Sequence, residues 1–170
     1  MQVLVIRHAI AAEAAPGEDD GARPLTRKGI RRFRQGVRGL AAMEMKIGAV
    51  LTSPWRRAAA TADLLAPLLT RGASCQVTDL LCQPPLPALL TALTAAGSQV
   101  SALRNASVAV VGHEPFLGEL IGLLTSGVAT VGESLQLKKG SVTVLHGSAV
   151  AGGMTLCALL PPRALRELGR

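Results

Sequence analysis

The chain has 170 residues, close to half of them hydrophobic, with two Phe, one Trp and no Tyr. This length suits one domain with a core of Leu, Val, Ile and Ala, and the scarcity of aromatic rings argues against nucleic-acid modules that stack bases. The net charge of +7 favours acidic or phosphorylated partners instead.

No sequence feature predicts secretion, a membrane span, a metal centre or a second domain. The amino terminus lacks the basic region of a signal peptide, and no apolar run is long enough to cross a bilayer. The cysteines, Cys75, Cys82 and Cys157, form neither a zinc motif nor a disulfide framework, which indicates reduced thiols. We therefore expect a single cytoplasmic domain over residues 1–170, with no cofactor, no metal, no membrane partner and no nucleic-acid partner.

The first element in the chain is an apolar run that ends in a basic pair. Residues 3–6 are apolar without alternation, which is typical of a strand buried on both faces. Arg7 and His8 follow at once, so we expect them at the carboxyl end of a central parallel strand, where ligands bind in open α/β sheets. Taken alone, this pair fits an anion site and a charge pair capping a surface strand equally well.

The next predicted element is a helix with an apolar and a basic stripe. It opens at Thr26, a hydroxyl N-cap, after an acidic loop at residues 11–24. The apolar stripe comprises Ile30, Phe33, Val37 and Leu40. The basic stripe comprises Arg27, Arg31, Arg34 and Arg38. The basic stripe is either a solvated face or a surface that docks an acidic partner, and the acidic loop could also neutralise it.

A second strand, residues 47–52, leads into a helix with arginines at its start. Ser53 is the predicted N-cap, with Pro54 as the first helical residue. Arg56 and Arg57 lie in the first turn, where basic side chains are electrostatically misplaced unless an anion binds there.

The rest of the chain completes an alternating α/β pattern. In order, it predicts a short strand at 76–78, an Ala/Leu helix ending near Leu103, a buried strand at 107–112, a helix from Pro115, a hairpin formed by 135–137 and 142–146, and a last strand at 154–160. We interpret His146, inside the hairpin, as a structural histidine, and Lys138-Lys139 as a charged turn.

Three predicted strands end in the same way, in residues that bind anions. If these strands are parallel neighbours, then Arg7-His8, the Ser53 to Arg57 segment and Gly112-His113 meet at one edge of the sheet. Such a cluster suits phosphate, and a neutral imidazole within it can act as a nucleophile toward phosphorus while the arginines stabilise the transferring oxygens.

The segments that form this cluster also carry a resemblance to a known family. The motifs are, in order, Arg7-His8, Leu25-Thr26 with Gly29, the Ser53 to Ala62 segment, and Gly112-His113. Together they resemble the histidine phosphatase superfamily, which has the phosphoglycerate-mutase-like fold. The small size and residues 111–115 (VGHEP) resemble its compact SixA-type phosphohistidine phosphatase branch. Ala9 stands where many members have glycine. Because its methyl group is small, we do not expect this difference to disable the site.

The resemblance implies both the fold and the roles of the clustered residues. The fold would be an α/β domain, a three-layer α/β/α sandwich with a mostly parallel central sheet. His8 would be the nucleophile that becomes phosphorylated, and Arg7, Arg57 and His113 would hold the phosphoryl oxygens. The implied enzyme is a metal-independent phosphatase that removes phosphate from phosphohistidine on a protein.

The general acid is left open by the sequence. Larger members of the superfamily use a carboxylate after the third strand, for which Asp79 is a tentative match and Glu114 a second candidate. Either could instead be an ordinary strand-end or helix-start residue. A phosphoramidate leaves readily once its imidazole is protonated, so the acid requirement is relaxed.

Two other functions remain consistent with the sequence. A phosphatase or mutase for small phosphate esters would use the same site, but it would need a lid, and the segment at residues 78–107 is short. A non-catalytic phosphoprotein-binding module would use the basic stripe, although it would not need both histidines. A metallohydrolase and a P-loop protein are disfavoured because neither ligand spacing nor a Gly-rich Lys-Ser/Thr loop occurs.

Overall fold

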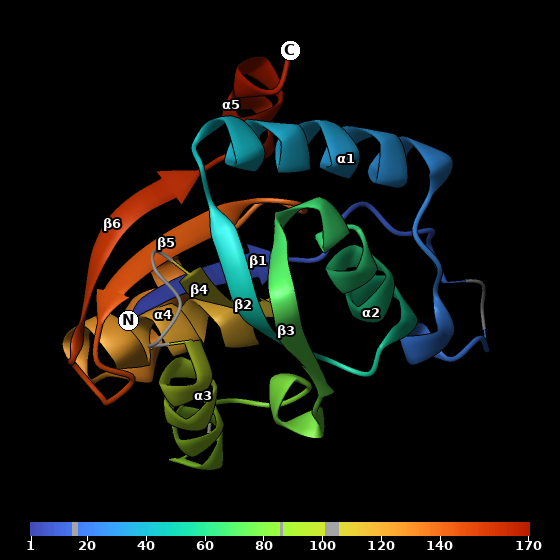
Figure 1. Ribbon diagram of the computed structural model, residues 1–170. Helices are drawn as coiled ribbons and strands as arrows, with labels where there is room; N and C mark the ends of the chain where they lie inside the picture. Colours follow the sequence, from blue (N-terminus) through green and yellow to red (C-terminus); the bar gives the residue numbers. More distant parts are fainter. Residues whose placement is uncertain (15–16, 86, 101–105) are drawn as a thin grey trace.

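The computed structural model describes residues 1–14, 17–85, 87–100 and 106–170, and its centre is a six-stranded sheet of order β3-β2-β4-β1-β5-β6 (Figure 1). The strands are β1 (Gln2–Arg7), β2 (Lys46–Thr52), β3 (Leu69–Val77), β4 (Ala106–Gly112), β5 (Val142–Gly147) and β6 (Met154–Leu160). β3, β2, β4 and β1 are parallel, whereas β5 and β6 run antiparallel at one edge. The mostly parallel α/β sheet predicted from the sequence is confirmed.

Helices cover both faces of this sheet. The helices are α1 (Arg27–Ala42), α2 (Arg56–Asp63), α3 (Pro87–Val100), α4 (Phe116–Ser126) and α5 (Pro162–Leu168). Side chains of α1, α2 and α5 share one core with alternate strand residues, while α3 and α4 share a second core with the residues between them. The uninterrupted apolar run of β1 follows from this arrangement, because Val3 and Val5 enter one core and Leu4 and Ile6 the other.

The three strands predicted to be central neighbours are neighbours. β4 lies between β2 and β1, and the register pairs Arg7 with Gly112 and Val111 with Thr52. The carboxyl ends of all three strands therefore meet at one edge of the sheet. The predicted N-cap of α1 is also confirmed, because the Thr26 hydroxyl accepts a hydrogen bond from the Gly29 N–H at 2.9 Å.

The predicted hairpin was wrong in one arm. Residues 135–140 form no strand, and β5 pairs instead with β6. The 135–140 segment crosses the end of β1, where the Gly140 N–H donates to the carbonyl groups of Arg7 and His8. The side chain of Leu137 is buried, so the alternation of apolar and polar residues at 135–137 resembles that of a strand. The backbone of this segment instead bonds to the end of β1.

Three other boundaries differ from the prediction. β3 spans nine residues rather than three, and its mostly exposed edge position leaves no apolar signal in the sequence. α2 begins at Arg56 rather than Pro54, and Ser53 accepts a hydrogen bond from the Trp55 N–H instead of capping the helix. The tail forms α5, which the sequence did not predict.

The predicted helix end near Leu103 lies outside the described residues; α3 is described to Val100. None of the helices that the structure describes is long and apolar enough to cross a membrane.

Candidate active site

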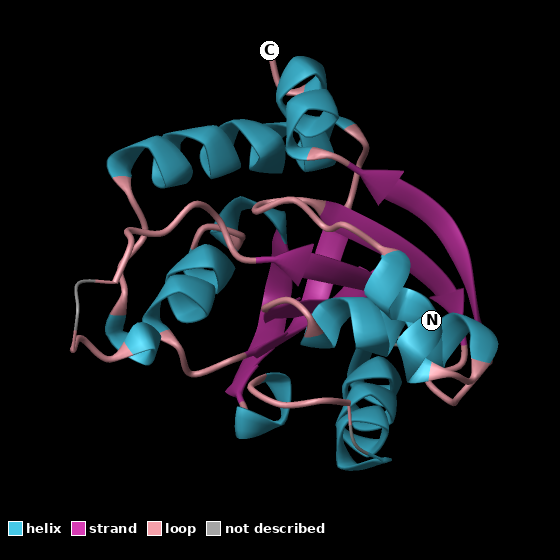
Figure 2. Cartoon of the chain, turned by 180° about the vertical axis from the view of Figure 1, so that it is seen from behind, coloured by secondary structure: helices cyan, strands magenta, loops and turns pink. Residues whose placement is uncertain are grey.

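The carboxyl ends of β1, β2 and β4 meet at one edge of the sheet, where each strand runs into a loop (Figure 2). The polar residues that follow these strands gather there. His8, Ser53 and His113 come directly after these strands, and Arg57 comes from the first turn of α2. Each of these four residues is at most 5% exposed, which is unusual for polar side chains and calls for partners.

His8 is held as a neutral imidazole with a defined tautomer. Its Nδ1 lies 2.7 Å from the carbonyl oxygen of Ala9, which can only accept, so Nδ1–H donates and Nε2 keeps its lone pair. Burial lowers the pKa of His8 to about 4; the Ala9 hydrogen bond opposes this, and the charges of Arg57, Arg7 and Lys139 add to it. The Nε2 atom lies 3.3 Å from Nε of Arg57. The nucleophilic form of the ring is therefore present at neutral pH.

Thr61 ties the loop that carries His8 to the helix that carries Arg57. The Thr61 hydroxyl accepts from the Ala9 N–H at 3.0 Å and donates to the Arg57 carbonyl at 2.6 Å. Both Thr61 and the Ala9 methyl group are buried. One buried hydroxyl thus links the two segments that carry the functional side chains.

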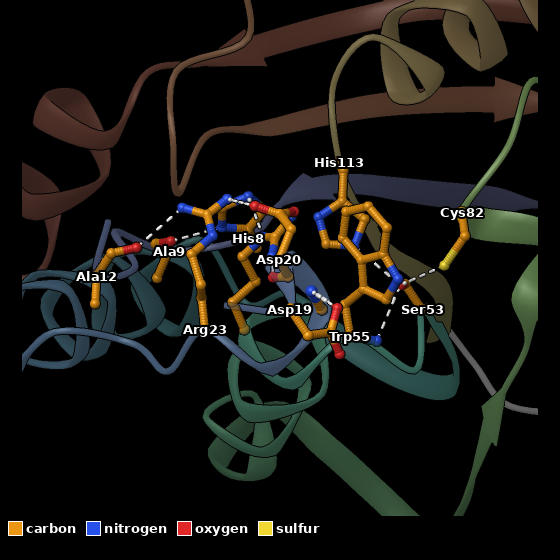
Figure 3. A network of polar contacts seen from close by, with 12 residues as sticks. His8, Ala9, Ala12, Asp19, Asp20, Arg23, Ser53, Trp55, Cys82 and His113 are labelled. Atoms are coloured by element: carbon orange, nitrogen blue, oxygen red, sulfur yellow. Dashed lines mark hydrogen bonds and ion pairs between the residues drawn. The ribbon is translucent and has the colours of Figure 1, made fainter. Parts of the chain in front are cut away.

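His113 faces His8 across the site (Figure 3). The ring centroids of the two histidines are 5.0 Å apart, and the centroid of the Trp55 ring lies 4.5 Å from that of His113. Nε2 of His113 is 2.9 Å from the Ser53 hydroxyl, whereas its buried Nδ1 has no partner among the described residues. Burial, followed by the neighbouring His8, lowers the pKa of His113 to about 3. If Ser53 donates to Nε2, then Nδ1–H is free to donate to an anion.

Arg57 is engaged by a carboxylate that the sequence did not assign to the site. Its Nη2 lies 2.7 Å from Oδ2 of Asp20, and its Nη1 donates to the Asp20 carbonyl (Figure 3 shows Asp20 beside His8). Arg23 holds the other carboxylate oxygen at 2.6 Å, and the Arg57 guanidinium lies 4.5 Å from the Trp55 ring centroid. The hydrogen bond from Arg57 holds the pKa of the Asp20 carboxyl below its usual range. Asp20, from the acidic loop, thus pairs with Arg23 and Arg57 rather than with the basic stripe of α1.

Arg7 and Glu114 lie together on the β5 side of the site. Nη1 of Arg7 donates to the Leu137 carbonyl, while its buried Nε has no partner in the described part of the chain. Burial lowers the pKa of Arg7, an effect that Glu114 opposes. Burial raises the pKa of Glu114, and the charge of Arg7 and the N–H groups of Gly118 and Leu137 reduce this rise. Glu114 is therefore a half-buried carboxyl whose pKa lies above its usual value.

Asp79, the tentative acid, is exposed in the turn Asp79–Leu81 after β3. From the same region it is Cys82 that reaches the site, with its Sγ 3.1 Å from the Ser53 hydroxyl. The role of general acid stays a prediction for Asp79 and for Glu114. His146 lies opposite Gln2 at the other end of β1, away from the site. Within the described residues, no group of His, Cys, Asp or Glu could hold a metal ion.

Sequence reasoning missed Asp20, Arg23 and Trp55. Asp20 and Arg23 belong to a loop without periodicity, so no local pattern in the sequence marks them as site residues. Trp55 is the single tryptophan of the chain and lies between two predicted site residues, a signal that could have drawn attention to it.

Comparison with known proteins places this site in context. No family model matches the chain. The chain is 33% identical over 136 residues to the phosphohistidine phosphatase SixA of Escherichia coli, covering 75% of this chain and 76% of that protein. A structure of the protein histidine phosphatase SixA complexed with tungstate has a TM-score of 0.76 at 26% identity, covering 97% of this chain and 99% of the other. The alpha-ribazole phosphatase of Shigella flexneri shares the fold, with a TM-score of 0.64 at 19% identity and coverages of 95% and 97%.

Proposed function

The chain belongs to the histidine phosphatase superfamily, and we propose that this phosphatase removes phosphate from phosphohistidine on a protein. The observation that carries the proposal is the neutral imidazole of His8, whose Nε2 lone pair faces the buried guanidinium of Arg57. The relative of established name at 33% identity is a phosphohistidine phosphatase, which supports the choice of substrate. The described part of the connection between β3 and β4 consists of a short turn and α3, which leaves little chain to form a lid over the site. An open site suits a phosphorylated side chain on a protein.

In the proposed reaction, Nε2 of His8 attacks phosphorus in line with the leaving group. A bond forms between Nε2 and phosphorus as the bond to the substrate imidazole breaks. That imidazole keeps the electron pair and takes a proton from the general acid, the role predicted for Glu114 or Asp79, or from water. Positive charge develops on the His8 ring, and the Ala9 carbonyl that accepts from Nδ1–H stabilises it. Water then attacks the phosphoenzyme, which releases inorganic phosphate and restores His8.

Three side chains are placed to bind the transferring oxygens. Nε of Arg7 is a buried donor without a partner among the described residues, and so is Nδ1 of His113 when Ser53 donates to Nε2; such groups are costly unless a ligand meets them. Arg57 donates its Nε–H to the His8 lone pair, so a bound phosphate must draw this contact away before attack. Loss of one such donor should cost about 2–4 kcal/mol of transition-state stabilisation.

The acid that protonates the leaving group distinguishes substrate classes. An imidazole leaving group is easily protonated, whereas an alkoxide requires a positioned acid. Glu114→Gln and Asp79→Asn should therefore slow hydrolysis of a phosphoester more than hydrolysis of a phosphohistidine peptide if either residue is the acid.

A substrate panel tests the proposed function. A phosphohistidine peptide, phosphoserine peptides, sugar phosphates and phosphoglycerate are compared in EDTA without added metal. We expect the highest kcat/KM for phosphohistidine and loss of turnover in His8→Ala. The matched control is His146→Ala, which should turn over normally, because His146 is an exposed residue of β5 that pairs with Gln2 at the far end of β1.

The other outcomes identify the alternatives. Best turnover of a small ester would replace the proposed substrate. Binding of phosphopeptide without phosphate release would indicate a binding module, and loss of all activity in EDTA would contradict metal independence.

A further inference from the structure

A groove of about 440 Å³ lies beside the proposed catalytic site, between α1, the turn at residues 138–140 and the start of α5. Figure 2 shows α1 and α5 side by side above the loops at this edge of the sheet. Its floor is apolar, with Phe33 and Ile10 among the lining residues. The mechanism proposed above makes no use of this groove.

The rim of the groove is strongly basic. The basic side chains that line it are Arg32, Lys138, Lys139, Arg163 and Arg166, and none of the described residues that line it is acidic. Arg163 pairs with Glu167 at 2.9 Å, and Arg166 donates to the Pro162 carbonyl. Arg32, Lys138 and Lys139 are exposed and have no partner in the described part of the chain. Unpaired cations over an apolar floor match a ligand that has both carboxylates and an apolar group.

The groove lies beside the loop that follows His8. Ala9, the residue after His8, is part of its lining, and the charge of Lys139 is close enough to lower the pKa of His8. The Gly140 N–H on its other wall donates to the carbonyls of Arg7 and His8. The groove therefore begins one residue from His8, within reach of the residues that flank a phosphorylated side chain bound there.

We propose that this groove docks an acidic segment of the substrate protein next to the phosphorylated residue, with carboxylates on Arg32 and Lys138 and an apolar side chain on the Phe33 floor. This inference rests on the proposed function, since it places the segment that flanks the phosphohistidine. The charge complementarity of the rim selects an acidic occupant. The basic stripe lines a different, shallower depression of about 300 Å³ that includes no residue adjacent to His8, so it is the poorer place for the flanking segment.

The test compares two phosphohistidine peptides of equal length, one with acidic flanking residues and one with serines at those positions. The groove variant carries Arg32→Glu and Lys138→Glu, both at exposed positions. The matched control carries Lys46→Glu and Arg71→Glu, which impose the same change of charge at exposed positions near the amino ends of β2 and β3. Thermal unfolding verifies that both variants are folded.

We expect the KM for the acidic peptide to rise roughly tenfold in the groove variant at low salt, with a smaller change for the serine peptide. The control variant should change both peptides to the same modest extent. The proposal is overturned if the groove variant loses no more preference for the acidic peptide than the control does.

Binding of a fluorescent, unphosphorylated acidic peptide separates this proposal from the proposed function. Tight binding to the wild type that weakens in the groove variant alone supports the groove, even if no phosphohistidine peptide is hydrolysed. If phosphohistidine is hydrolysed but both variants bind the acidic peptide equally, the groove proposal fails while the proposed function stands.

Discussion

Replacing Thr61 by valine removes the hydroxyl that joins the His8 loop to α2 and hardly changes the shape of the side chain. Thr61 is fully buried, so the Ala9 N–H that donates to it would lose its acceptor with no room for water. A buried, unsatisfied N–H costs about 2 kcal/mol. For a domain of this size, such a loss lowers the Tm by about 4–8 °C.

Thr143→Val is the matched control, because Thr143 is also fully buried and its hydroxyl has no partner among the described residues. Its replacement should leave the Tm unchanged or raise it, since an unsatisfied hydroxyl is removed from the core. Thr61→Val should also reduce kcat, because Ala9 positions the His8 ring. Calorimetry and turnover of a chromogenic phosphate test both effects. Equal Tm values for the two variants would refute the role assigned to Thr61.

Three further predictions follow from the site and from the surface of α1. The folded state keeps His8 neutral down to about pH 4 and His113 down to about pH 3, whereas histidines in the unfolded chain take up protons near pH 6.5. The free energy of unfolding should therefore fall as the pH drops below 6.5, by roughly 3 kcal/mol for His8. Urea midpoints that stay constant from pH 7 to 4.5 would contradict this. Asp20→Asn should strengthen inhibition by vanadate by about threefold, because it removes a partly exposed carboxylate that competes for the same guanidinium; weaker inhibition would instead assign Asp20 to anion binding. Reversal of Arg31 and Arg34 to Glu should slow turnover of a full-length phosphoprotein at low salt, with a smaller effect at high salt and on a chromogenic phosphate; equal losses for both substrates would exclude a docking role.

The sequence predicted the part of the site that depends on the sheet. Uninterrupted apolar runs marked β1, β2 and β4 as strands buried on both faces, and the parallel arrangement then brings Arg7, His8, Arg57 and His113 to one edge. These residues could be predicted because buried strands have a strong apolar signal in the sequence. Parallel strands also share a direction, so the residues that follow them lie at the same edge of the sheet.

The parts that the sequence did not predict depend on loops and edges. Asp20 reaches Arg57 across 37 positions from a loop without periodicity, so no local pattern could pair the two. β3 is an edge strand whose side chains are mostly exposed, which removes the apolar signal. Residues 135–137 alternate like a strand, but the Leu137 carbonyl accepts from Arg7 instead of from a neighbouring strand.

The central claim, that His8 carries the phosphate during turnover, is tested most directly by trapping the phosphoenzyme. A labelled phosphohistidine peptide is mixed with the wild type and quenched within one turnover in base, which preserves phosphohistidine, and peptide mapping then locates the label. We expect acid-labile phosphate on His8, and no labelled enzyme in His8→Ala although that variant still binds vanadate. Label on any other residue, or turnover by His8→Ala close to the wild-type rate, would contradict the claim.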